Sequence, residues 1–316
     1  MEKEPIIIGR GLIEKKEELK KIINEERDSA LAPFEGELQK NERLLLFIDF
    51  INYILKKEFN FLGLEKEWEN VDYQQVHLLS SETFEKKFPG RKDTGGACNR
   101  FGNYMIITTK KENDNDFDAF KTLIHELLHL KARKSFGVNE EGEYYTSRQG
   151  LSVDKIVDTN RQPFLGPIDE GFVDFLTEYL IDKYKDEIDN KLAFKDMEPY
   201  HSNRAFWRAC QYPTIFIVEK IINKISNAKK VKKEEIISLF EKNYFAGNLL
   251  PVIKEIVNCC GGKSLEVLKK ISFDDFSRGY SDEFHLFLNY FDESTDEKKR
   301  KEIENKLGII FEGLDN

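Results

Sequence analysis

One five-residue stretch constrains this chain more than any other: it reads His125-Glu126-Leu127-Leu128-His129. Residues four apart lie on the same face of an α-helix, one turn from each other, so a helix would point both imidazoles the same way. At that spacing, two imidazole nitrogens can bind a single Zn²⁺. Glu126 would lie about 100° around the helix from His125, where its carboxylate can reach a metal-bound water without binding the metal.

The surrounding residues 117–132 favour such a helix. Asp114, Asp116 and Asp118 come at its start, where they can cap the helix and stabilise its first turn. The apolar side chains form a broad surface, as expected of a buried helix, and Gly137 is expected to end the helix. The simpler alternative is an amphipathic helix whose two histidines only pack or form hydrogen bonds.

A catalytic zinc site usually has three protein ligands and one open position, so a third ligand has to come from elsewhere. A second helix is predicted to begin near Pro167, with acids in its first turn. Glu170, Asp174 and Glu178 follow at spacings of four and share one face. Gly171 has no side chain, and we expect it to let this helix approach the histidine helix closely.

With these two motifs, residues 70–180 resemble the gluzincin metallopeptidases, which include thermolysin-like enzymes and the M1 aminopeptidases. The residues that carry the resemblance are His125, Glu126, His129, Glu170, Gly171 and Asp174. It implies one catalytic Zn²⁺ bound by His125, His129 and Glu170. It also implies that Asp174 orients a ligand histidine, which fixes the tautomer and raises the basicity of the ring. Two features depart from the family pattern: Asp169 stands where Asn is common, and the gap from His129 to Glu170 is longer than in thermolysin-like enzymes.

Two short runs upstream predict β-strands: Val76-His77-Leu78-Leu79, and residues 104–109, which are rich in β-branched side chains. His77 is interpreted as a packed core or strand-edge residue. In gluzincin-like proteins an edge strand precedes the active-site helix, and an extended substrate adds to it through main-chain hydrogen bonds. We place that edge within residues 95–100, and its candidate residues are Gly96, Ala97, Cys98 and Asn99.

The same segment separates two kinds of peptidase. M1 aminopeptidases have a G-x-M-E-N sequence at this place, and its glutamate binds the free amine of the substrate. The segment Gly96-Ala97-Cys98-Asn99 contains no acid, so a free α-amine would meet no counter-charge. An endopeptidase is therefore favoured. Cys98 itself is interpreted as a small strand residue, with a redox or switch role as the alternative.

Peptide hydrolysis also needs a hydrogen-bond donor for the developing oxyanion. In gluzincin-like sites this donor is a Tyr or His well downstream of the third zinc ligand. The resemblance therefore points to Tyr200, His201 and Tyr212. His201 and Tyr200 are favoured, and the sequence does not choose between them.

Composition narrows the class of protein. A net charge of −9 gives no basic footprint for nucleic acid. No run reaches the roughly 18 apolar residues of a transmembrane helix, and residues 1–21 lack the apolar core of a signal peptide. Four cysteines in 316 residues are too few for a disulfide framework. We expect a cytoplasmic protein without nucleic-acid or membrane partners, although export by a signal-less route would leave the same sequence.

The expected fold class is α+β and mostly α, with a zincin-like catalytic core made of a small mixed sheet, the active-site helix and the glutamate helix. Apolar periodicity indicates an N-terminal helical region over residues 1–69 and a C-terminal helical domain over residues 203–316. The catalytic domain would cover residues 70–202. Within it, residues 138–165 are polar and turn-rich, and two short runs on either side of residues 147–150 predict a hairpin, either a lid or a plain surface loop.

The sequence thus predicts a zinc-dependent metallopeptidase that acts on a peptide or protein substrate. Glu126 would take a proton from the attacking water and pass it to the leaving amine. Two alternatives stay open. One is a zincin-like binding or regulatory module with little activity, and the other is a zinc hydrolase that acts on a non-peptide amide.

Overall fold

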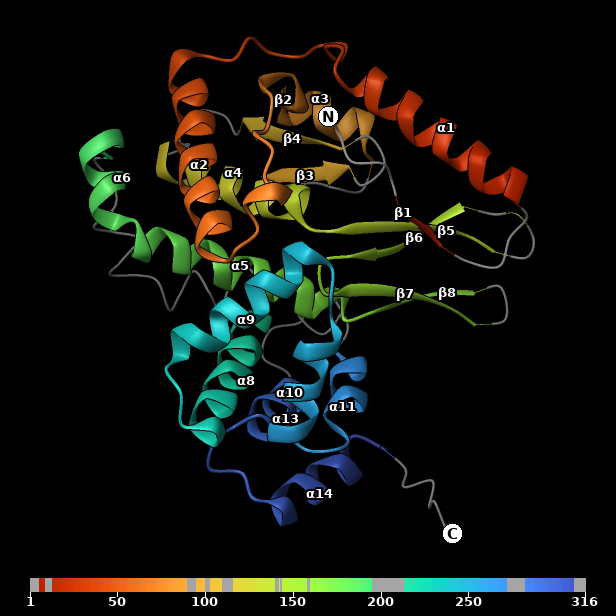
Figure 1. Cartoon of the computed structure of the whole chain (residues 1–316), viewed down its shortest axis with the longest axis vertical. Helices are drawn as coiled ribbons and strands as arrows, with labels where there is room; N and C mark the ends of the chain where they lie inside the picture. Colours follow the sequence, from red (N-terminus) through yellow and green to blue (C-terminus); the bar gives the residue numbers. More distant parts are fainter. Residues whose placement is uncertain are drawn as a thin grey trace. The chain divides into compact units, whose positions relative to one another are not determined.

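The computed structural model describes residues 6–8, 13–89, 95–99, 103–109, 116–139, 142, 144–157, 160–194, 213–271 and 282–309 (Figure 1). Helices make up most of the described chain, and the strands are short and mixed in direction. This confirms the expected α+β, mostly α fold class. The chain divides into two compact units, residues 1–150 with 177–203 and residues 151–176 with 204–316. The three sequence-based domains, residues 1–69, 70–202 and 203–316, stay a prediction.

The first unit contains a three-stranded sheet at the positions predicted from the sequence. Its strands, in order, are β2 (Val76–Ser80), β4 (Tyr104–Thr109) and β3 (Gly96–Asn99). β2 runs parallel to β4, whereas β3 runs antiparallel to it, with Gly96 opposite Ile107. Within the described residues β3 pairs on one side only, so it occupies the expected edge position.

The first unit also contains helices. They are α1 (Ile13–Ala30), α2 (Glu42–Phe61), the short 3-10 helices η1 (Glu65–Glu67) and η2 (Tyr73–Gln75), α3 (Ser81–Lys87), α4 (Asp116–Lys131) and α6 (Lys185–Leu192). Of these, α3 and α4 contact this sheet. α2 begins where the Asn41 side chain accepts a hydrogen bond from the Leu44 amide at 2.8 Å, a typical N-cap. Its buried face includes Phe47, whose ring packs edge-on against Phe120 of α4 at a centroid distance of 5.4 Å. This aromatic contact helps to hold α4 against α2.

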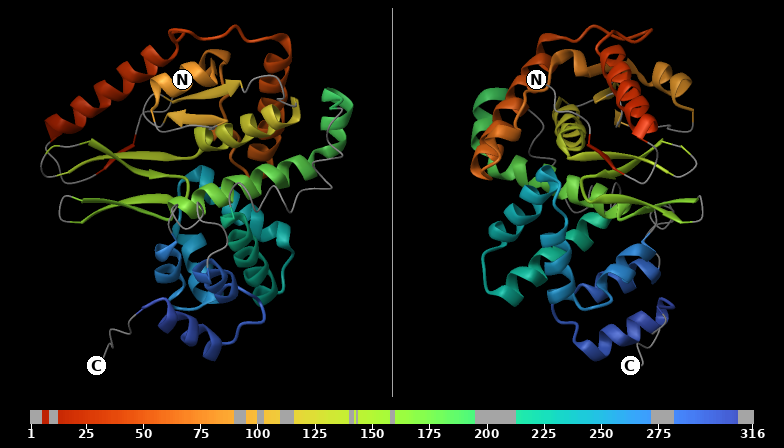
Figure 2. Two further views of the ribbon diagram at one scale, coloured as in Figure 1. Left: turned by 180° about the vertical axis from the view of Figure 1, so that it is seen from behind. Right: turned by 45° about the vertical axis from the view of Figure 1, so that its right-hand side comes forward.

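The first unit contains a further set of strands, one of which lies at the N-terminus and was not predicted from the sequence. β1 (Ile6–Ile8) pairs in parallel with β5 (Lys134–Val138), and β6 (Tyr144–Gln149) pairs antiparallel with β5. α1 lies alongside these strands (Figure 2), and the buried residues of this contact are Leu19, Ile23, Phe136 and Val138. The N-terminal region, predicted to be helical, therefore also contributes a strand.

His77 on β2 is buried, as predicted for a core residue. Its Nδ1 lies 2.8 Å from a carboxylate oxygen of Glu37, and its Nε2 lies 2.7 Å from the carbonyl oxygen of Ala30. The rings of Phe34 and Tyr104 pack on the imidazole at centroid distances of 4.2 and 5.3 Å. His77 therefore ties the end of α1 and the segment that follows it to the sheet.

The described residues of the second unit are helical apart from one strand pair, β7 (Ser152–Val157) and β8 (Asn160–Phe164), which are antiparallel. The sequence predicts a turn at residues 147–150, but β6 continues to Gln149 and β7 begins at Ser152, so the turn lies at residues 150–151. The helices are the first part of α5 (Gly166–Lys183), then α8 (Thr214–Lys229), α9 (Lys233–Ala246), α10 (Leu250–Cys260), α11 (Ser264–Lys270), α13 (Asp282–Tyr290) and α14 (Glu297–Lys306). Within the described ranges, none of the helices combines the length and the apolar character needed to cross a membrane.

Gly171 of α5 makes room for a different helix from the one expected. A Cβ atom at this position would lie 2.6 Å from Oγ1 of Thr214 and 2.7 Å from its backbone carbonyl carbon. The three atoms nearest to such a Cβ all belong to Thr214, the first residue of α8. Gly171 therefore makes room for the start of α8, which the sequence did not predict, and the expected close approach of the histidine helix stays a prediction.

Candidate metal centre

The predicted histidine helix is α4, and its bounds lie within a residue of those expected. Asp116 and Asp118 occupy its first turn, where carboxylates interact favourably with the helix dipole. The buried apolar side chains of α4 are Phe117, Phe120, Leu123, Ile124, Leu127, Leu128 and Leu130. Their burial fixes the rotation of the helix, and that rotation determines where His125, Glu126 and His129 lie.

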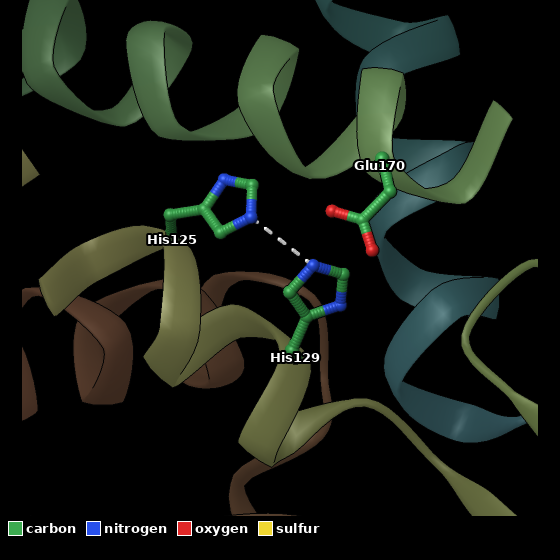
Figure 3. Close-up of side chains that lie close together, drawn as sticks. All are labelled: His125, His129 and Glu170. Atoms are coloured by element: carbon green, nitrogen blue, oxygen red, sulfur yellow. Dashed lines mark hydrogen bonds between the residues drawn. The ribbon is translucent and has the colours of Figure 1, made fainter. Parts of the chain in front are cut away.

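The two imidazoles already have the separation that a shared metal ion requires. The Nε2 atoms of His125 and His129 lie 3.2 Å apart, and the ring centroids lie 4.8 Å apart (Figure 3). Two nitrogens that bind one tetrahedral Zn²⁺ at 2.0–2.1 Å would be about 3.3 Å apart. His129 is buried and His125 is partly exposed, so a metal held by both would keep one side open.

Glu170 provides the third donor. It lies near the start of α5, and its carboxylate points toward the imidazole pair (Figure 3). One donor atom from each of His125, His129 and Glu170 lies within 4.8 Å of the other two. In the part of the chain that the structure describes, no other group of three or more His, Cys, Asp or Glu side chains gathers in this way. The structure thus brings together the three ligands that the resemblance implies.

The other acids of α5 have different surroundings. Asp169 is buried, and its carboxylate accepts a hydrogen bond from the Leu151 amide at 2.6 Å. Asp174 and Glu178 are also buried, and neither belongs to the three-residue group. Asp169 therefore fixes the local fold, whereas the orienting role expected for Asp174 stays a prediction.

Glu126 lies beside the strand that the sequence assigns to substrate. It is 7% exposed and is not one of the three grouped donors. A Cβ atom at Gly96 of β3 would lie 2.7 Å from Cγ of Glu126, so the two residues are in direct contact. Thr108 of β4 holds β3 in place, because its amide and hydroxyl donate to the Gly95 carbonyl at 2.9 and 3.1 Å.

The remaining residues of β3 lie along the same edge. Ala97 packs on the core cluster that contains Tyr104, and Asn99 donates a hydrogen bond to the Tyr104 hydroxyl at 3.1 Å. Burial raises the pKa of Tyr104, so this hydroxyl stays protonated at neutral pH. Cys98 is partly buried within the strand and forms no disulfide with the other described cysteines, at the place expected for a small strand residue.

The expected oxyanion donors, Tyr200, His201 and Tyr212, lie outside the described residues. One contact near the histidines was not predicted: the buried side chain of Gln149 donates to the carbonyl oxygen of His129 at 3.1 Å. It satisfies one of the carbonyls that the last turn of a helix leaves without a partner in the helix. Nothing in the sequence indicates this contact, because Gln149 falls in the turn predicted at residues 147–150.

The chain matches no protein-family model, no curated protein and no solved structure at a significant level. The interpretation of this site therefore depends on its own residues and geometry.

Proposed function

We propose that the protein is a zinc-dependent metallopeptidase with a zincin-like core. The observation that carries the proposal is the group of His125, His129 and Glu170, with the two Nε2 atoms 3.2 Å apart. Two histidines and a glutamate, with the fourth position open, form a donor set of catalytic zinc sites in peptidases. A structural zinc site is closed by four protein ligands, and within the described residues no fourth side chain joins this group.

When bound, a zinc ion would lower the pKa of a water molecule and polarise the scissile carbonyl. The chain itself supplies the proton transfers. A carboxylate oxygen of Glu126 takes the proton of the attacking water and then gives it to the nitrogen of the leaving amine. Asp174 orients a ligand histidine, and Tyr200 or His201 donates a hydrogen bond to the oxyanion.

Endopeptidase action fits the edge strand better than aminopeptidase action. Among the described strands, β3 is at the edge of its sheet, next to β4, and an extended peptide can add to an edge strand through main-chain hydrogen bonds. Its residues, Gly96 to Asn99, offer no carboxylate to a free α-amine. A substrate bound along β3 would therefore be recognised through its backbone and could extend past the cleavage point in both directions.

Hydrolysis of a peptide library by the full-length chain, with zinc and with an added chelator, tests this proposal. We expect hydrolysis that stops when zinc is removed and returns when it is restored. Glu126→Gln should lower kcat about 10²–10⁴-fold, because general-base catalysis is lost, while the zinc content stays unchanged.

Asp118→Asn is the matched control, since it removes an exposed carboxylate from the same helix, and we expect it to keep full activity. Wild-type turnover by Glu126→Gln would contradict the assignment of the base. A chain that binds zinc but cleaves no peptide would instead support a binding module or a hydrolase of another amide.

A further inference from the structure

Two successive glycines lie against α4 at the start of β3, Gly95 just before the strand and Gly96 as its first residue, and their contacts with the helix differ. Gly95 faces Thr122 and Gly96 faces Glu126, residues one turn apart on α4. A Cβ at Gly95 would lie 3.5 Å from Thr122, an ordinary van der Waals contact. A Cβ at Gly96 would lie 2.7 Å from Cγ, 3.1 Å from Cδ and 2.9 Å from Oε1 of Glu126. Only the second position is closed to a side chain.

The requirement for glycine at position 96 is steric. Neither Gly95 nor Gly96 is among the residues with a positive φ, so their backbone conformation is open to other residues. Within a strand, alanine is normally preferred over glycine by about 0.5–1 kcal/mol, because it restricts the unfolded chain. Without the contact to Glu126, alanine at position 96 would therefore be neutral or stabilising.

The backbones on both sides of this contact are held in place. Gly96 pairs with Ile107 in the sheet, and the neighbouring Gly95 carbonyl accepts two hydrogen bonds from Thr108. On the other side, Glu126 is 7% exposed, and its helix neighbours Leu123 and Leu127 are fully buried. An added methyl group would therefore turn the Glu126 side chain and leave the strand and the helix in place.

We propose that Gly96 is a positioning residue for Glu126. Because Gly96 has no side chain, the Glu126 side chain can lie against the strand, and this contact fixes the position of the carboxylate that acts as the base. The predicted effect on catalysis rests on the proposed function, whereas the steric contact between Gly96 and Glu126 does not depend on it. A displacement of about 1 Å at a reacting group lowers rates by about 10²-fold. Gly96→Ala should therefore lower kcat about 10²-fold, with little change in KM and with full zinc content.

The first test is a stability cycle that needs no activity. Gly96→Ala is measured by thermal unfolding in the wild-type chain and in the Glu126→Ala background, with Gly95→Ala as the matched control. We expect Gly96→Ala to lower the melting temperature of the wild-type chain and to have no such effect once Glu126 is truncated. Gly95→Ala should behave alike in both backgrounds. An equal loss from Gly96→Ala in both backgrounds would overturn the proposal.

The second test measures kcat, KM and zinc content on a cleaved peptide. Gly96→Ala should lose kcat with normal zinc, whereas Gly95→Ala should lose far less, because its Cβ meets Thr122 at an ordinary contact distance. Equal losses of kcat from both substitutions would show that the strand as a whole matters and would contradict a specific seat for Glu126. If the wild-type chain cleaves no peptide, the proposed function fails, while the stability cycle still decides whether Gly96 seats Glu126.

Discussion

The acidic side chains near the start of α5 show how strongly the role of a carboxylate depends on its neighbours. Asp169 accepts a hydrogen bond from the Leu151 amide, whereas the next residue, Glu170, joins His125 and His129. The two carboxylates are adjacent in sequence and differ by about 100° in direction. They therefore make separate contributions, one to the fold and one to the metal site, which substitutions can distinguish.

Glu170→Gln tests the ligand assignment with almost no change in size. Loss of the anionic oxygen should weaken zinc binding at least tenfold, because ligand carboxylates bind metals in the deprotonated form. Asp169→Asn is the control, and we expect it to lower the melting temperature while keeping zinc stoichiometric. Competition of each variant with a zinc-binding dye gives the affinities. Unchanged affinity in Glu170→Gln would move the third ligand to another acid of α5.

Glu37 gives the first unit a defined pH dependence. Burial by itself raises the pKa of Glu37, but hydrogen bonds from Lys40, His77 and the Phe34 amide outweigh it and hold the pKa below its ordinary value of 4.5. A carboxyl whose pKa is lower in the folded state stabilises the fold fully above the unfolded pKa. That contribution is lost as the pH falls through the folded value.

Glu37→Gln should therefore be less stable than the wild type at pH 7, and the difference should shrink below about pH 4.5. Urea unfolding at neutral and acidic pH measures both values. Glu35→Gln is the control, because Glu35 is exposed in the same segment. A difference in stability that stays constant across this pH range would contradict the role of the ionised carboxylate.

At the scale of elements, α5 packs closely against the start of α8 in the second unit. Gly171→Ala would place a Cβ 2.7 Å from the backbone of Thr214, and a backbone atom cannot turn aside as a side-chain end can. Overpacking of this kind destabilises by about 1–3 kcal/mol. Chemical denaturation measures the loss, with Gly262→Ala as the control, since a Cβ there meets no atom within 4 Å. Equal stability of the two variants would contradict the close packing.

The elements with strong local patterns were predictable from the sequence. α4 has a broad apolar surface and acids in its first turn, α5 begins near Pro167 with an acid in its first turn, and β4 is rich in β-branched residues. β1 was not predicted, because three residues gain their strand conformation only by pairing with β5, far along the chain. The sequence predicts a polar loop where β8 forms, because Pro163 and the polar residues of this segment disfavour a strand. β8 forms through its pairing with β7.

The candidate site was predictable to the same extent. His125, Glu126 and His129 are linked by helical spacing alone, which is a local property of the sequence. Glu170 was assigned through a family resemblance, because no local rule connects residues so far apart. The contact between Gly96 and Glu126 depends on how a strand crosses a helix. Sequence spacing carries no information about that crossing.

At the scale of the whole molecule, the division into two units has no sequence signal. One boundary falls between Leu176 and Thr177, inside the continuous helix α5. Domain boundaries are usually recognised by polar, glycine-rich or proline-rich linkers. An uninterrupted helix contains no such linker, so composition and periodicity could not place this boundary.

Zinc should stabilise the folded chain as a whole, because a ligand that binds only the folded state raises its stability by mass action. At a zinc concentration 100 times the Kd, the gain is about 2.7 kcal/mol. A rise in melting temperature with added zinc measures it. His125→Ala should abolish the rise, and this histidine is suited to the test because it is only partly buried. An equal rise in both proteins would place the zinc elsewhere.

X-ray absorption at the zinc edge of the zinc-loaded, full-length chain tests the central claim most directly. We predict four nitrogen or oxygen neighbours at about 2.0–2.2 Å, with the scattering pattern of two imidazole rings. Sulfur neighbours at about 2.3 Å, or a spectrum without imidazole scattering, would contradict a metal centre built on His125, His129 and Glu170.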